Sequence, residues 1–85
     1  MTTYNFHQDP GHGWIEVPMS EIERLCIADQ ISPYSYRKGA TAYLEEDCDA
    51  SVFLRAKEAR GEAFAFRDVH TNRDSFIRNL DRFGG

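Results

Sequence analysis

The sequence predicts a single small α+β domain, residues 1–85, in which two helices pack on one face of an antiparallel sheet. Eighty-five residues are too few to divide into two units that each bury a core. Four short segments have the alternation or aromatic content of strands, and two have the apolar spacing of helices. Their order along the chain is β-α-β-β-α-β, followed by a short C-terminal helix or tail.

The first strand is expected at residues 14–17, after an N-terminal arm or loop at residues 1–12. The turn formers around Asp9-Pro10-Gly11 and the lack of a clean apolar period predict that arm. Ile15 and Val17 alternate onto one face. Pro18 ends the strand, because proline has no N–H to donate.

A first helix is expected to begin at Ser20 and to end by about Ile31. Ser20 and Glu23 have the spacing of a capping box, and Pro33 disfavours helical geometry at the residue before it. The helix has an apolar stripe made by Met19, Ile22, Leu25 and Cys26. We expect Cys26 and Cys48 to be buried free thiols, with a disulfide and a redox role as the alternatives.

A hairpin is expected next, with strands at residues 34–36 and 41–44 and a reversal that contains Gly39. Tyr34 and Tyr36 fall on one face of it, and Tyr43 can pair with them across the ladder. These tyrosines are either core residues or the centre of an interface, where tyrosine is enriched.

A second helix is expected from Asp47 or Asp49, which suit its N-cap, to Gly61, which suits a left-handed stop. Its inward side is predicted to hold Val52, Phe53, Ala56 and Ala59. A fourth strand at residues 62–67 places Phe64 and Phe66 on one face.

The C-terminal segment is predicted to form a short helix with one apolar face. The apolar residues that define that face are Phe76, Ile77, Leu80 and Phe83. Residues 84–85 are expected to be a disordered tail.

Charge is divided unevenly along the chain. Residues 1–50 hold nine acids and three bases, and residues 51–85 hold five acids and seven bases, which gives the net charge of −4. An acidic first half argues against a general nucleic-acid binder and fits a basic partner. No apolar run approaches the roughly 20 residues of a membrane span, and the polar start lacks a signal peptide's regions. We therefore expect a cytoplasmic protein.

Four carboxylates collect where the second helix begins: Glu45, Glu46, Asp47 and Asp49. They are interpreted as helix caps and solvated charge, as a surface for a basic partner, or as ligands of a divalent cation. The run lacks the glycine and the distal glutamate of a calcium loop. The histidines and cysteines match no zinc-binding spacing. No catalytic residue, resident metal or cofactor is therefore predicted.

Four segments carry a resemblance to small proteins encoded by bacteriophages and other mobile elements. They are His12-Gly13-Trp14, Tyr34-Ser35-Tyr36, residues 43–49 and His70-Thr71-Asn72, within a span of about residues 9–80. By analogy, this resemblance implies an inhibitor of host defence, of the anti-CRISPR or anti-restriction type. The order of strands and helices also resembles the ferredoxin-like sandwich.

The leading hypothesis is a non-enzymatic inhibitor that binds a larger host protein or ribonucleoprotein with a basic surface. It would act by steric occlusion or nucleic-acid mimicry, without binding nucleic acid or membrane itself. Its expected contact residues are Glu45, Glu46, Asp47, Asp49, Tyr34 and Tyr36. One alternative is a small metal-dependent enzyme that uses His12, His70 and the acidic cluster. Another is a nucleic-acid-binding regulator that uses the arginines Arg73, Arg78 and Arg82.

Overall fold

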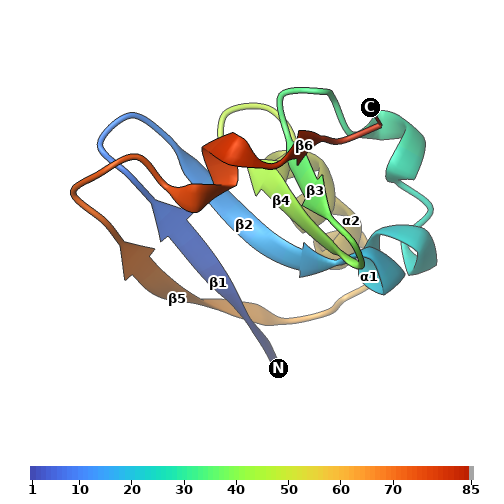
Figure 1. The fold of residues 1–85 in the computed structure, drawn as a ribbon. Helices are drawn as coiled ribbons and strands as arrows, with labels where there is room; N and C mark the ends of the chain where they lie inside the picture. Colours follow the sequence, from blue (N-terminus) through green and yellow to red (C-terminus); the bar gives the residue numbers. More distant parts are fainter. Residues whose placement is uncertain (85) are drawn as a thin grey trace.

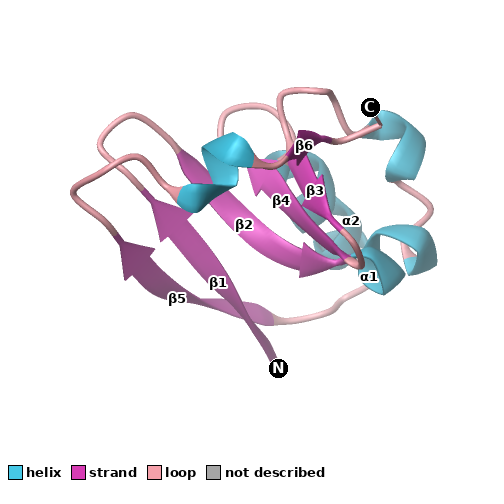
Figure 2. Ribbon diagram, in the orientation of Figure 1, coloured by secondary structure: helices cyan, strands magenta, loops and turns pink. Residues whose placement is uncertain are grey.

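The chain folds around a six-stranded mixed sheet with the strand order β5-β1-β2-β4-β3-β6, as the computed structural model of residues 1–84 shows (Figure 1). The strands are β1 (Thr2–Gln8), β2 (Gly13–Pro18), β3 (Tyr36–Lys38), β4 (Thr41–Glu45), β5 (Phe64–His70) and β6 (Asp81–Arg82). The helices are α1 (Met19–Arg24) and α2 (Ala50–Ala59), with short 3₁₀ turns η1 (Ala28–Gln30) and η2 (Phe76–Asn79) (Figure 2). The predicted small α+β domain is confirmed.

Residues 2–8 form strand β1, so the prediction of an N-terminal arm over residues 1–12 is wrong for most of its length. β1 lies inside the sheet, antiparallel to β2 on one side and parallel to β5 on the other. Tyr4 and Phe6 alternate onto the core face, as strand residues do. The turn formers that suggested an arm make only the short connection between β1 and β2.

The parallel pairing of β1 with β5 means that the sheet is not antiparallel throughout, as was predicted. Its seven paired positions run from Thr2 with Phe64 to Gln8 with His70. β1 stands between β5 and β2, where the ferredoxin-like sandwich would pair those two strands directly. The ferredoxin-like order is therefore not confirmed.

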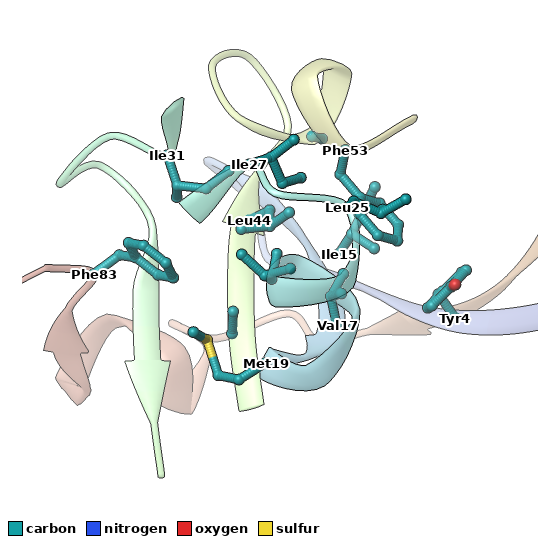
Figure 3. Close-up of a cluster of buried hydrophobic side chains, with 13 residues drawn as sticks. Tyr4, Ile15, Val17, Met19, Leu25, Ile27, Ile31, Leu44, Phe53 and Phe83 are labelled. Atoms are coloured by element: carbon teal, nitrogen blue, oxygen red, sulfur yellow. The ribbon is translucent and has the colours of Figure 1, made fainter. Parts of the chain in front are cut away.

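The main core lies on the sheet face that α1 and α2 cover. Alternate residues of β2 and β4 point into it, including Val17 and Leu44, which are both completely buried. Phe53 of α2 is also completely buried and meets the Tyr4 ring edge to face, with 5.2 Å between ring centroids. Figure 3 shows these side chains converging from strands, helices and the C-terminal Phe83.

A second, smaller core lies on the opposite face of the sheet, under η2. Trp14 of β2, Tyr43 of β4 and Ile77 of η2 form it. In Figure 1, η2 passes in front of the sheet and α2 behind it. The prediction of one apolar C-terminal helical face is wrong, because Ile77 and Phe83 are buried in different cores. Gly84, predicted as tail, is exposed, and Gly85 lies outside the described residues.

The first helix is shorter than predicted. It ends at Arg24, and Cys26 then adopts a positive φ of 57°, which breaks helical geometry. The capping box does not form, since Pro18 is the N-cap and no side chain caps the helix. Cys26 and Cys48 are both free and exposed, so the prediction of buried thiols is wrong.

The second helix ends as predicted, with Gly61 at a positive φ of 69°. Its buried side differs from the prediction, because Ala59 is exposed and Lys57 is buried. The Lys57 ammonium donates to Tyr4 Oη at 2.8 Å and to Glu62 Oε1 at 3.1 Å. Hydrogen bonds from Arg24, and then from Lys57, lower the pKa of Glu62 to about 2. Sequence periodicity did not place Lys57 on the inward side, because its acceptor Tyr4 lies 53 residues earlier in the chain.

Within residues 1–84, no helix has the length and apolar character that crossing a membrane requires.

The completely buried Phe53 generates a stability prediction. Replacing Phe53 with Ala removes the ring that joins α2 to β1, and should lower the free energy of unfolding by about 3–5 kcal/mol. Phe76→Ala is the matched control, because Phe76 is 52% exposed and its loss should cost about 1 kcal/mol or less. Urea titration followed by circular dichroism measures both. Equal destabilisation by the two variants would contradict the proposed core.

Candidate functional site

One hollow of about 380 Å³ is lined by aromatic, acidic and basic side chains and by one thiol. We call it the aromatic hollow. It is lined by His12, Trp14, Tyr34, Tyr36, Glu45, Asp47, Cys48, Arg78 and Arg82. These residues come from the β1–β2 connection, β2, the segment that enters β3, the β4–α2 connection and the C-terminal segment. The hollow is therefore a product of the tertiary fold.

The pairing of the strands positions the side chains that form one wall of the aromatic hollow. Trp14 pairs with Glu45 across β2 and β4, and Tyr36 pairs with Arg82 across β3 and β6. The rings of Trp14 and Tyr36 meet edge to face, with 6.3 Å between centroids. The Arg82 guanidinium lies 5.3 Å from the Tyr36 ring centroid, a cation–π distance. Two aromatic rings and a stacked arginine thus form one continuous wall.

Asp9 holds two sides of the aromatic hollow together. Its buried carboxylate accepts hydrogen bonds from Arg78 Nε at 2.6 Å and Arg78 Nη2 at 2.9 Å. It also accepts from the backbone N–H groups of Gly11, His12 and Ser75. The bonds from Arg78, together with the backbone donors, hold the pKa of Asp9 far below its ordinary value. The loop that carries His12 is thereby tied to the segment that carries Arg78.

The four predicted acidic contact residues do not form one surface, and two of them are buried. Asp49 is 3% exposed and accepts from the Ser32 N–H at 3.0 Å, the Ser32 hydroxyl at 2.7 Å and the Ser35 hydroxyl. It joins the segment before β3 to the start of α2. Glu45 is 7% exposed and faces the aromatic hollow. The prediction that Glu45 and Asp49 present accessible charge is therefore wrong.

Glu46 and Asp47 are exposed, but they point to different places. Asp47 lines the aromatic hollow. Glu46 lines a separate apolar groove with Phe6 and Leu54. Burial, and then the charges of Asp47 and Glu45, raise the pKa of Glu46. Among the four predicted acids, only Asp47 is both exposed and part of the hollow. Sequence proximity misled here because adjacent residues in a turn point in different directions.

The predicted tyrosines divide between core and surface. Tyr34 is 64% exposed at the rim of the hollow, and Tyr36 is half-buried in its wall. Tyr43 pairs with Tyr36 as predicted, but lies in the small core between the rings of His7 and Phe76. Tyr34 and Tyr36 are therefore the tyrosines available to a partner.

The structure brings one predicted histidine to the acidic residues. Ligand atoms of His12, Glu45 and Asp47 all lie within 4.8 Å of one another. His70 ends β5 outside this group, and His7 is buried against Glu16, with 2.7 Å between Nε2 and Oε1. The pairing of His12 with His70 that a metal-dependent enzyme was predicted to use is not formed.

Cys48 also lines the hollow, but its environment opposes nucleophilic chemistry. Desolvation of the thiol raises its pKa, and so do a hydrogen bond with Glu45 and the nearby carboxylate charges. A thiol with a raised pKa carries little of the reactive thiolate at neutral pH.

No family model, curated protein or solved structure matches this chain. The function must therefore be inferred from the site itself.

Sequence reasoning missed Trp14, Arg78 and Arg82 as site residues. Trp14 had a usable signal, because it alternates with Ile15 and so must lie on the opposite face from the main core. Arg78 and Arg82 were considered only as a nucleic-acid patch. Arg78 is instead bound by Asp9, and Arg82 stacks on Tyr36 and donates to the Pro33 carbonyl.

The Asp9–Arg78 pair generates a prediction about acid stability. Because the pKa of Asp9 is lower in the folded chain than its ordinary value of 3.8, its stabilisation is complete above that value and declines as pH falls. Asp9→Asn should lower the free energy of unfolding at pH 7 by about 2 kcal/mol. Between about pH 4 and pH 2 its stability should fall less steeply than that of the wild type.

Urea titrations at a series of pH values test this expectation. Asp74→Asn is the matched control, since Asp74 is 88% exposed and lies 3.9 Å from the same Arg78 Nε atom. Identical pH profiles for Asp9→Asn and the wild type would rule out Asp9 as the source of the acid sensitivity.

Proposed function

We propose that the protein is a non-enzymatic binding protein that recognises a larger protein through the aromatic hollow. The observation that carries this proposal is the composition of the hollow, which combines Trp14, Tyr34, Tyr36, Arg78 and Arg82. Tryptophan, tyrosine and arginine are the residue types most enriched among interface hot spots. Of these, Tyr34 and Arg82 are exposed and Tyr36 is half-buried, whereas Trp14 is buried in the small core. Tyrosine supplies a large contact area at low cost in side-chain entropy.

The residues at the rim of the hollow are accessible to a partner, and those of its wall are held in fixed positions. Tyr34 and Asp47 are exposed at the rim, where a partner can reach them without any change of fold. Arg82 is held by its stacking on Tyr36 and its bond to Pro33, so it loses little further freedom on binding. A partner that inserts a side chain into the hollow would meet pre-organised groups.

The charge of the rim favours a partner with a basic side chain opposite Asp47. The net charge of −4 assists the approach of a basic surface over longer distances. The four acids were expected to imitate a row of phosphates, but Glu45 and Asp49 are buried and Glu46 points elsewhere. Steric occlusion is therefore favoured over nucleic-acid mimicry as the mode of action.

The resemblance to mobile-element proteins suggests the kind of partner and the kind of cell in which the protein acts. Three of its four segments contribute residues to the hollow: His12 and Trp14, Tyr34 and Tyr36, and Glu45, Asp47 and Cys48. We therefore propose a host defence complex, of the CRISPR effector or restriction type, as the partner in a bacterial cytoplasm.

The test is a plasmid-interference assay in bacteria that carry defined CRISPR or restriction systems. Expression of the protein should restore transformation by a targeted plasmid in at least one system. Tyr34→Ala and Asp47→Asn should each weaken binding to the purified complex at least about tenfold, or about 1.4 kcal/mol. Binding should also weaken as salt rises, because the rim contact is charged.

Glu58→Gln is the control for the change in charge, since Glu58 is exposed on α2 outside the hollow. It should bind like the wild type. Lack of protection in every system tested would contradict the proposed setting. Full binding by both Tyr34→Ala and Asp47→Asn would contradict the hollow as the contact surface.

A further inference from the structure

We propose that His12, Glu45 and Asp47 form a binding site for a divalent transition-metal ion of the zinc class. Their ligand atoms lie within 4.8 Å of one another at the edge of the aromatic hollow. His12 comes from the β1–β2 connection, Glu45 ends β4, and Asp47 follows in the β4–α2 connection. The site is therefore assembled by pairing of β2 with β1 and β4.

The spacing of these atoms suits a tetrahedral ion. His12 Nδ1 and Glu45 Oε1 are 3.4 Å apart. Zinc bonds to nitrogen and oxygen of about 2.1 Å give a tetrahedral edge of roughly 3.4 Å. The His12 and Asp47 side chains are exposed, so their rotation can bring the remaining atoms to the same separation. Glu45 is the fixed member, because strand pairing and burial hold it in place.

The electrostatic setting of Glu45 calls for a cation. Its side chain is only 9% exposed, yet in residues 1–84 its single ion-pair contact is with His12. The other strongly buried carboxylates are compensated. Asp9 pairs with Arg78, and Asp49 accepts three hydrogen bonds from serines. Glu45 accepts a hydrogen bond from the Asp47 N–H at 2.8 Å and has one with the Cys48 thiol, but within residues 1–84 no lysine or arginine pairs with it. A bound divalent ion would supply the positive charge that this buried carboxylate lacks.

A second observation points to a ligand at the same place. The indole Nε1–H of Trp14 is buried and has no hydrogen-bond acceptor among residues 1–84. Trp14 pairs with Glu45 in the β2–β4 register, and its ring lies 6.0 Å from that of His12. Leaving a buried donor without a partner is energetically unfavourable, because the group has lost its hydrogen bonds to water. A water molecule or carboxylate held on a metal ion is an acceptor of the kind that this N–H lacks.

The donor atoms select the class of metal. One imidazole nitrogen with two carboxylates suits zinc and its neighbours in the first transition series. Magnesium and calcium prefer oxygen ligands alone, and calcium takes six to eight of them. Three protein ligands would also leave one position of a four-coordinate ion open. This inference goes beyond the proposed function and does not rest on it, because the free chain supplies all three ligands.

The test uses the purified full chain after dialysis against a chelator. Isothermal titration with ZnCl₂ should show one equivalent bound per chain, and elemental analysis after gel filtration should confirm it. His12→Gln and Asp47→Asn should each lower the affinity for Zn²⁺ at least about tenfold. MgCl₂ should give no comparable binding.

The matched controls are His70→Gln and Asp29→Asn, which make the same chemical changes at exposed positions outside the group. Both should bind Zn²⁺ like the wild type, and circular dichroism checks that every variant is folded. Absence of Zn²⁺ binding would overturn the proposal. So would unchanged affinity in His12→Gln and Asp47→Asn, or an equal loss in the controls. No partner is needed, so failure here leaves the partner-binding proposal standing, and the reverse also holds.

Discussion

The ion pair between Asp9 and Arg78 is the interaction on which the candidate site depends. The C-terminal segment pairs with the sheet through the two-residue strand β6, which is too short to hold it alone. Asp9 accepts three hydrogen bonds from this segment, one from the Ser75 N–H and two from Arg78, and so ties it to a connection 66 to 69 residues earlier in the chain. With that tie in place, Ile77 fills the small core and Arg82 lies over Tyr36. Without it, the aromatic hollow would lose one wall.

Buried polar groups join distant segments in two further places. Asp49 connects the start of α2 to the turn before β3, and Lys57 connects α2 to β1 and to Glu62 before β5. Buried charges of this kind contribute little net stability, but they penalise arrangements that leave them unpaired. Small domains have few apolar residues with which to define one arrangement. In this chain, the pairing of buried charged residues therefore helps the apolar core to define one fold.

The parts of the fold that local pattern determines were predictable, and the parts that long-range pairing determines were not. Alternation located β2, and the positive-φ glycine located the end of α2. β1 was missed because nearby turn formers obscured its alternation, and its pairing with β5 has no local signal. At the site, Tyr34 and Asp47 were identified from residue type alone. The burial of Glu45 and Asp49 was not, since it depends on serines and a histidine from other segments.

The internal position of β1 constrains the order in which the sheet can be completed. β1 precedes its parallel neighbour β5 along the chain, so β5 leaves the ribosome more than fifty residues later. Until then, the growing chain exposes an unpaired strand edge together with the apolar side chain of Phe6. Contacts of such high sequence separation slow folding, because a long loop must close before they form. During synthesis, one edge of β1 therefore stays open to pairing with strands of other chains until β5 has emerged.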